Sequence, residues 1–181
     1  MRVLVVIVVL LVIVGGFFVW YITTSNNIKR TDIKVAEALS GIDVALTKRY
    51  DVLTKMLDIV KNYQNYERET LMQIISLRSG MSMKERNEAS RNMDKVSSDI
   101  RLLAENYPEL RSSANFAELQ KSVMDVEEHL QAARRLYNAN VTSYNNMIVA
   151  FPSSVVANNI GAVKKDFFEA EAIKRQDVKM F

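Results

Sequence analysis

The chain has 181 residues, of which 49% are hydrophobic and 25% are charged, and its formal net charge at pH 7 is +3. The 24 basic and 21 acidic residues are dispersed, and they form no basic stripe interleaved with aromatic residues of the kind that binds nucleic acid. We therefore expect no nucleic acid among the partners. The chain has no cysteine, which excludes disulfides and a lipid-modified cysteine.

An apolar segment stands near the start of the chain. Residues 3–22 read VLVVIVVLLVIVGGFFVWYI and carry no charge. At about 1.5 Å per residue this helix matches the ~30 Å hydrocarbon core of a bilayer. A cleaved signal peptide would have a shorter apolar region and a small-residue cleavage site, but the first alanine is Ala36. We predict an uncleaved transmembrane anchor over residues 1–24, which contacts lipid through residues that include Val3, Leu10, Gly15, Gly16, Trp20 and Ile22.

Basic residues flank this segment on both sides. Arg2 precedes it, whereas Lys29, Arg30 and Lys34 follow it closely. The positive-inside rule therefore favours a single-pass protein whose remaining residues lie in the cytoplasm.

The next region repeats apolar residues in alternating steps of four and three, which is typical of a helix in a bundle or coiled coil. Arg49 is the one charged residue on this seam, and we expect it to pair with a carboxylate or to lie at the seam's edge. The positions are Val35, Leu39, Ile42, Leu46, Arg49, Leu53, Met56, Val60 and Tyr63.

A second region carries an apolar face over residues 71–77, and Gly80 is expected to end that helix. Ser82 and Glu85 have the spacing of a capping box, which predicts that a new helix begins there. Its seam runs to Pro108 and consists of Met93, Val96, Ile100, Leu103 and Tyr107.

In the third region, Asn115 and Glu118 again have capping-box spacing. A long apolar line follows until Pro152, and residues 153–163 are expected to form a last short helix. The line is made of Leu119, Val123, Val126, Leu130, Ala133, Tyr137, Val141, Tyr144, Ile148 and Phe151.

These patterns predict an all-α fold, in which an N-terminal transmembrane helix is followed by an antiparallel bundle of long helices. The bundle has three long helical regions and a short fourth. We divide the chain into the anchor (residues 1–24), the bundle (25–166) and a C-terminal tail (167–181).

The third region contains a Tyr-Asn repeat, Tyr137–Asn138 and Tyr144–Asn145. The two tyrosines are one heptad apart, so they share a helix face. We interpret them as buried seam residues, whose asparagines bond to a facing helix and fix its register. Tyr63 and Tyr107 are expected to meet this layer. The alternative is a surface that binds a ligand or a protein partner.

Arg134 and Arg135 lie beside this repeat. They are expected either to pair with Glu127, Glu128 or Asp51, or to bind phosphate or an acidic partner.

No residue set predicts catalysis. His129 is the only histidine, and position 126, where a di-iron bundle would have glutamate, is valine. The chain has no G-x-S-x-G elbow and no phosphate-binding glycine loop. We expect no enzyme activity, no cofactor and no metal.

Three blocks of sequence resemble the LemA family of bacterial membrane-anchored proteins. They are KRYDVLTKMLDIVKNYQNYE (residues 48–67), ENYPELRSSANFAELQ (105–120) and VEEHLQAARRLYNANVTSYNNMIVAFPSSVVA (126–157), and DFFEA and the final VKMF also have counterparts. Thr54 stands where many members have proline, and Asn62 and Tyr66 replace a glycine and a histidine. If those positions kink the first helix in relatives, we expect the first helix of this chain to run straighter.

The resemblance implies an N-terminal anchor, an antiparallel helical bundle and a short N-terminus outside the membrane, without a known activity. We hypothesise a membrane-anchored interaction or scaffold protein that binds protein partners or assembles with itself. The alternative is a membrane-tethered sensor that binds a small ligand or peptide in its bundle.

Overall fold

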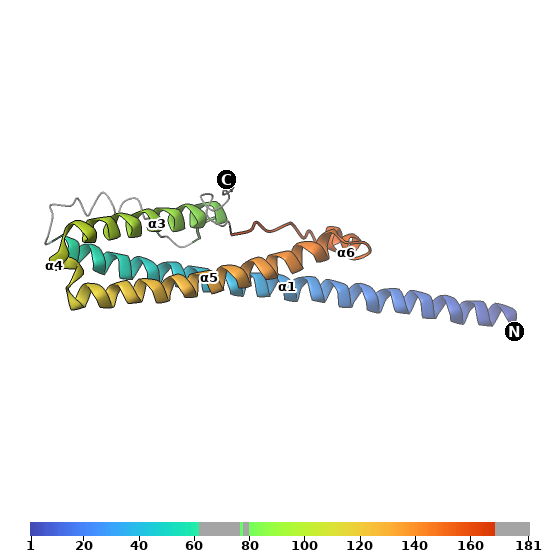
Figure 1. Cartoon of the computed structure of the whole chain (residues 1–181). Coiled ribbons are helices and arrows are strands. Elements are labelled where there is room, and N and C mark those ends of the chain that lie inside the picture. The colour runs from blue at the N-terminus through green and yellow to red at the C-terminus, as the bar shows by residue number, and fades with distance from the viewer. Residues whose placement is uncertain (62–76, 78–79, 169–181) are drawn as a thin grey trace, which may run out of the picture. The chain divides into compact units, whose positions relative to one another are not determined.

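The computed structural model describes residues 1–61, 77 and 80–168. Every regular element among these residues is a helix, which confirms the all-α fold class (Figure 1). The elements are α1 (Arg2–Val60), α3 (Met83–Asn106), α4 (Pro108–Arg111), α5 (Ala114–Val149) and α6 (Ser153–Asn159).

Helix α1 contains the predicted anchor and continues without a break into the seam region. Every residue from Met1 to Val19 is exposed, and the apolar part of α1 is long enough to cross a membrane. Thr54 lies inside the helix, where its hydroxyl donates to the Tyr50 carbonyl at 2.8 Å. Helix α1 therefore continues through Thr54 without a break.

The chain forms two compact units, and both α1 and α5 contribute to each. Unit 1 contains residues 1–38 and 138–166, so it holds the first part of α1, the end of α5 and α6. The amide of Asn140 donates to the Lys34 carbonyl at 3.3 Å and joins the two long helices. Their facing sides bury Ser25, Ile28, Val35 and Ala38 of α1 and Val141, Tyr144, Ile148, Val156 and Ala157 of α5 and α6.

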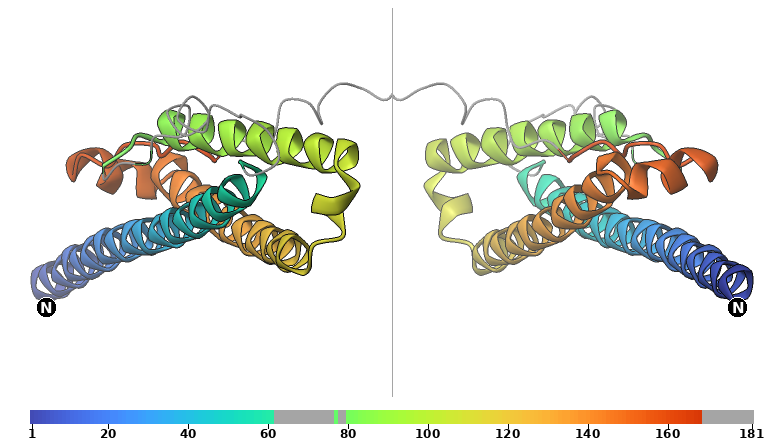
Figure 2. Two further views of the ribbon diagram at one scale, coloured as in Figure 1. Left: turned by 90° about the vertical axis from the view of Figure 1, so that its left-hand side faces the viewer. Right: turned by 90° about the vertical axis from the view of Figure 1, so that its right-hand side faces the viewer.

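Unit 2 contains the second part of α1, α3, α4 and the first part of α5. Contacts of α1 with α3 advance in the same direction along both helices, because Asp43 pairs with Arg86 and Arg49 with Asp94. These two helices are therefore parallel, and α5 is antiparallel to them (Figure 1). Figure 2 shows α4 linking the end of α3 to the start of α5.

The predicted seams form the core of the described helices. On α1 they are buried except for Leu39, which is half-buried, and Tyr63, which lies outside the described residues. On α3, Leu103 and Tyr107 are half-buried and the other seam residues are buried. Five further residues of α1 complete its buried face: Ser25, Ile28, Ala38, Ala45 and Leu57.

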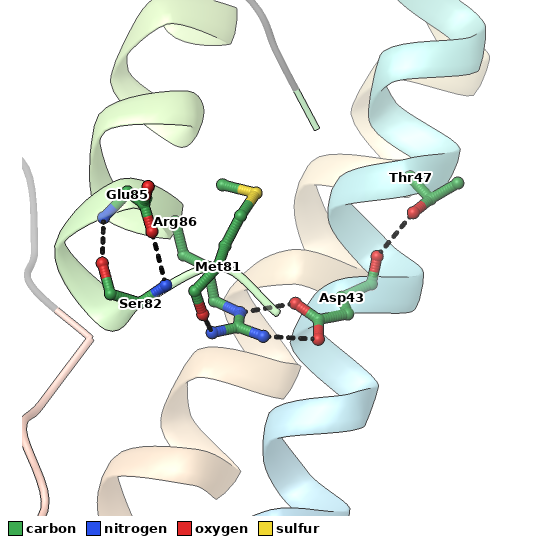
Figure 3. A network of polar contacts seen from close by, with 6 residues as sticks. All are labelled: Asp43, Thr47, Met81, Ser82, Glu85 and Arg86. Carbon is green, nitrogen blue, oxygen red and sulfur yellow. Dashed lines mark hydrogen bonds and ion pairs between the residues drawn. The ribbon is translucent and has the colours of Figure 1, made fainter. Parts of the chain in front are cut away.

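The starts of α3 and α5 differ in how well they were predicted. The Ser82 side chain caps α3 by accepting from the Glu85 amide, and the Ser82 amide donates to the Glu85 carboxylate at 2.7 Å. Both hydrogen bonds of the capping box are therefore confirmed (Figure 3). The box predicted at Asn115 is wrong as a helix start, because α5 begins at Ala114 and Asn115 lies within its first turn.

The end of α5 also differs from the expectation. The helix stops at Val149, so Phe151 falls in the turn before α6 and is 84% exposed. Its placement on the buried seam was wrong. The short helix expected after Pro152 is confirmed as α6, whereas α4 was not predicted; its Leu110 is fully buried.

Two glycines in different conformations give a matched test of the fold. Gly80 has φ of +78°, while Gly41 is inside α1, and a Cβ at either would meet no atom within 4 Å. Gly80→Ala should lower the free energy of unfolding by about 1 kcal/mol, because the left-handed conformation disfavours a side chain. Gly41→Ala should raise it by about 0.5–1 kcal/mol, since alanine is the better helix former. Urea unfolding of both variants measures the change in the free energy of unfolding. A change of the same sign in both variants would contradict the backbone conformations assigned to Gly80 and Gly41.

Candidate functional site

Arg49 is at the centre of a buried group of charges in unit 2. Its side chain is 2% exposed, and its Nη2 forms ion pairs with Asp94 of α3 and Glu127 of α5. Its Nη1 also donates to the Ser90 carbonyl at 3.3 Å. The expectation that Arg49 pairs with a carboxylate is confirmed, and this one guanidinium joins three helices.

The chemistry of this group is structural. A buried guanidinium loses its water, and here two carboxylates and one carbonyl replace it at Nη1 and Nη2, whereas Nε is buried without a hydrogen-bond partner among the described residues. Asp94 and Glu127 are less than one third exposed. The geometry restricts α1, α3 and α5 to the register in which these side chains meet.

A second charged group joins α1 to the start of α3. Arg86 donates to both carboxylate oxygens of Asp43, at 2.6 and 2.8 Å, and to the Met81 carbonyl (Figure 3). The hydrogen bond with Asp43 raises the pKa of Arg86 above its ordinary value, although burial of the guanidinium opposes the shift. Thr47 donates to the main-chain carbonyl of Asp43 at 2.8 Å.

This pair was missed at the sequence level. A signal was present, because Arg86 and Ser90 continue the four-three spacing of the α3 seam backwards from Met93, and Ser97 lies in the same spacing between Met93 and Ile100. All five are buried. A polar residue in the register of a seam therefore marked an internal partner.

Arg134 and Arg135 have different surroundings. Arg134 is buried, and its guanidinium carbon lies 4.8 Å above the ring of Phe168, which is 2% exposed. This cation–π contact with the C-terminal part of the chain was not predicted. Arg135 is exposed on α5.

The Tyr-Asn repeat is on the buried seam as predicted, since Tyr137 and Tyr144 are each 3% exposed and their asparagines are half-buried. The expectation that Tyr107 lies beside Tyr137 and Tyr144 is wrong. Arg86, near the start of α3, interacts with Tyr137, while Tyr107 follows the end of α3, about 30 Å further along. Tyr63 lies outside the described residues.

Asn145 holds a non-helical segment in unit 1. Its side chain accepts from the Lys165 amide and donates to the Lys165 carbonyl, both at 2.9 Å. The expectation that it bonds to a facing helix was wrong, because residues 162–168 are not helical. The ammonium of Lys165 lies 3.0 Å from Asp32 and 5.7 Å from the centre of the Tyr144 ring.

Burial raises the pKa of the Tyr144 phenol above its ordinary value. The negative charge of Asp32 adds to this shift, whereas the positive charge of Lys165 acts against it. Tyr144 therefore remains a neutral seam residue at neutral pH.

The other candidate side chains do not form a reactive group. His129 is exposed on α5. Across residues 1–61 and 80–168, no cluster of three or more His, Asp or Glu side chains is placed to bind a metal ion.

Comparison with known proteins gives a consistent match. Residues 38–181 match the profile of the LemA family. The chain is 29% identical over 163 residues to Protein LemA of Metamycoplasma hominis, and the alignment covers 87% of this chain and 74% of that protein. The similarity thus includes most of the anchor-to-bundle helix as well as the bundle.

The Arg49 group makes a direct prediction for stability. Arg49→Met should lower the free energy of unfolding by about 3 kcal/mol, because Asp94 and Glu127 lose their cation in a largely buried site. Adding Asp94→Asn and Glu127→Gln should recover part of this loss. Arg135→Met, at an exposed position on α5, should change stability by less than about 0.5 kcal/mol. Chemical unfolding monitored by circular dichroism measures all three, and equal losses for both arginines would refute the role of Arg49.

Tyr144 predicts a dependence on alkaline pH. Because its folded-state pKa is raised, its contribution to stability is complete below pH of about 10, the unfolded value, and is lost as the pH rises through the folded value. As the pH rises above ~10, the free energy of unfolding of Tyr144→Phe should therefore fall less steeply than that of the wild type. Thermal unfolding across this range provides the measurement, and superimposable pH profiles would contradict it.

Proposed function

This chain belongs to the LemA family, and we propose that it is a membrane-anchored scaffold, whose helical bundle binds other proteins or further copies of itself at a bacterial membrane. The observation that carries this proposal is the continuity of α1 over Arg2–Val60. The predicted anchor and a core helix of the bundle are therefore one continuous helix, with no separate linker segment between them.

The placement of the charged side chains supports a scaffold over an enzyme. Arg49 and Arg86 are buried in unit 2, where Arg49 is paired with two carboxylates and Arg86 with one, and each also donates to a main-chain carbonyl. Their contacts are of the kind that fixes helix register. We propose that the protein has no catalytic activity and needs no cofactor.

The orientation is proposed from charge. Lys29, Arg30 and Lys34 follow the apolar segment, whereas Arg2 alone precedes it. The positive-inside rule then places the bundle in the cytoplasm and the short N-terminus outside. A tag after Phe181 should resist protease in intact cells and be digested after lysis; digestion in intact cells would reverse the orientation.

Crosslinking tests the scaffold. The full chain, treated in its native membrane with a lysine-reactive crosslinker, should give a specific product with a second copy or another membrane protein. Lys29, Lys48 and Lys55 are exposed on α1 and supply reactive amines in both units. The Arg49→Met variant is the matched control, because a product that depends on the folded bundle should decrease with it. Exclusive recovery of uncrosslinked chain would contradict the proposal.

A further inference from the structure

Unit 1 contains an uncharged surface beside the apolar segment of α1. No charged residue occurs between Arg135 and Lys164, a stretch that forms the end of α5, the turn after it and all of α6. The rest of the chain after Ile22 has charged residues in every helix except α6. A water-facing surface has no need for this exclusion, whereas a surface that is buried at the boundary between headgroups and acyl chains is favoured by it.

The turn between α5 and α6 lies at the level where the apolar segment ends. Asn140 contacts Lys34, and α5 runs antiparallel to α1 in this unit (Figure 1). Nine residues further along α5 is Val149, and nine residues back along α1 is Ser25, which is the first buried residue of α1. Ser25 is only ~4.5 Å along the helix from Ile22, so the turn is within the ~5–7 Å headgroup layer of a membrane spanned by residues 3–22.

Large apolar side chains are exposed at this turn. Val149 is 52% exposed, Phe151 84% and Val155 49%. They come from the end of α5, the turn and α6, so they flank one bend of the chain. Exposed to water they contribute nothing to folding, but buried at the interface of a bilayer they contribute their apolar area.

Cations lie just beyond the same level. Lys29 and Arg30 are exposed on α1, and Lys164 is exposed in the segment after α6. Lys29 is ~10 Å along α1 from Ile22, which is within reach of phosphate groups for a side chain that extends toward the membrane. Apolar residues at the turn with cations above them match the polarity of an anionic leaflet.

We propose that the α5–α6 turn is a second membrane contact, in which Val149, Phe151 and Val155 enter the headgroup layer beside the transmembrane segment. The occupant of this surface is the lipid bilayer, because the surface is continuous with the apolar part of α1 in the same unit. This inference rests on the membrane anchoring proposed above. The contact would fix unit 1 against the membrane at two points.

Single-cysteine labelling tests the contact, because the natural chain has no cysteine. Full-length Phe151→Cys, Val155→Cys, Ile33→Cys and Val12→Cys variants are labelled with bimane and reconstituted in vesicles of phosphatidylethanolamine and phosphatidylglycerol. The same lipids with brominated acyl chains serve as a quencher. Ile33 is the matched control, since it is an apolar residue of unit 1 that is 67% exposed and ~16 Å along α1 from Ile22.

Bimane at Phe151 and Val155 should shift its emission to shorter wavelength on reconstitution and lose intensity in brominated lipid, whereas bimane at Ile33 should do neither. Quenching at Val12 but not at Phe151 or Val155 would overturn the second contact and leave the anchor intact. Absence of quenching at Val12 would overturn the anchor and this inference together. Helical circular dichroism of each labelled variant confirms that it is folded.

Discussion

The continuity of α1 is the constraint on which the rest of this structure depends. Over Arg2–Val60 the helix changes from apolar on every side to apolar on one stripe, without a break in its backbone. The chain's two prolines are Pro108 and Pro152, and both stand at the boundaries of short helices. Helix α1 therefore contains no proline that would end it, either in its apolar segment or in its seam region.

Buried charge gives the bundle its specificity. An apolar seam alone tolerates several registers, because one leucine or valine packs much like the next. Arg49 and Arg86 remove that freedom, since a shift of one turn would separate Arg49 from its two carboxylates and Arg86 from its one. The two groups are one to two turns apart on α1, from Asp43 to Arg49, so they determine the position of α3 along α1 twice. Such groups trade some stability for a unique arrangement.

The sequence predicted what depends on local period and missed what depends on distant partners. The seams of α1, α3 and α5 and the cap at Ser82 follow from spacing within one helix. The Arg86–Asp43 pair joins residues 43 positions apart, and no local sequence pattern around either residue indicates its partner. Asn145 was read as a helix-to-helix contact because the segment around Lys165 has no periodicity to indicate that it returns to α5.

The turn at the end of α5 illustrates the same limit. Phe151 continues the apolar spacing of its helix, but the backbone leaves the helix at Val149, so spacing no longer predicts burial. The membrane contact proposed for this turn gives its exposure a physical explanation.

Hydrogen exchange at the junction between the apolar segment and the bundle tests the continuity of α1 most directly. The full chain in lipid bilayers is transferred to deuterated buffer, and exchange is followed for the amides of residues 22–34. A continuous helix predicts slow exchange throughout, with no step in protection after Ile22. Rapid exchange confined to this region, with protected amides on both sides, would show that anchor and bundle are separate elements joined by an open linker.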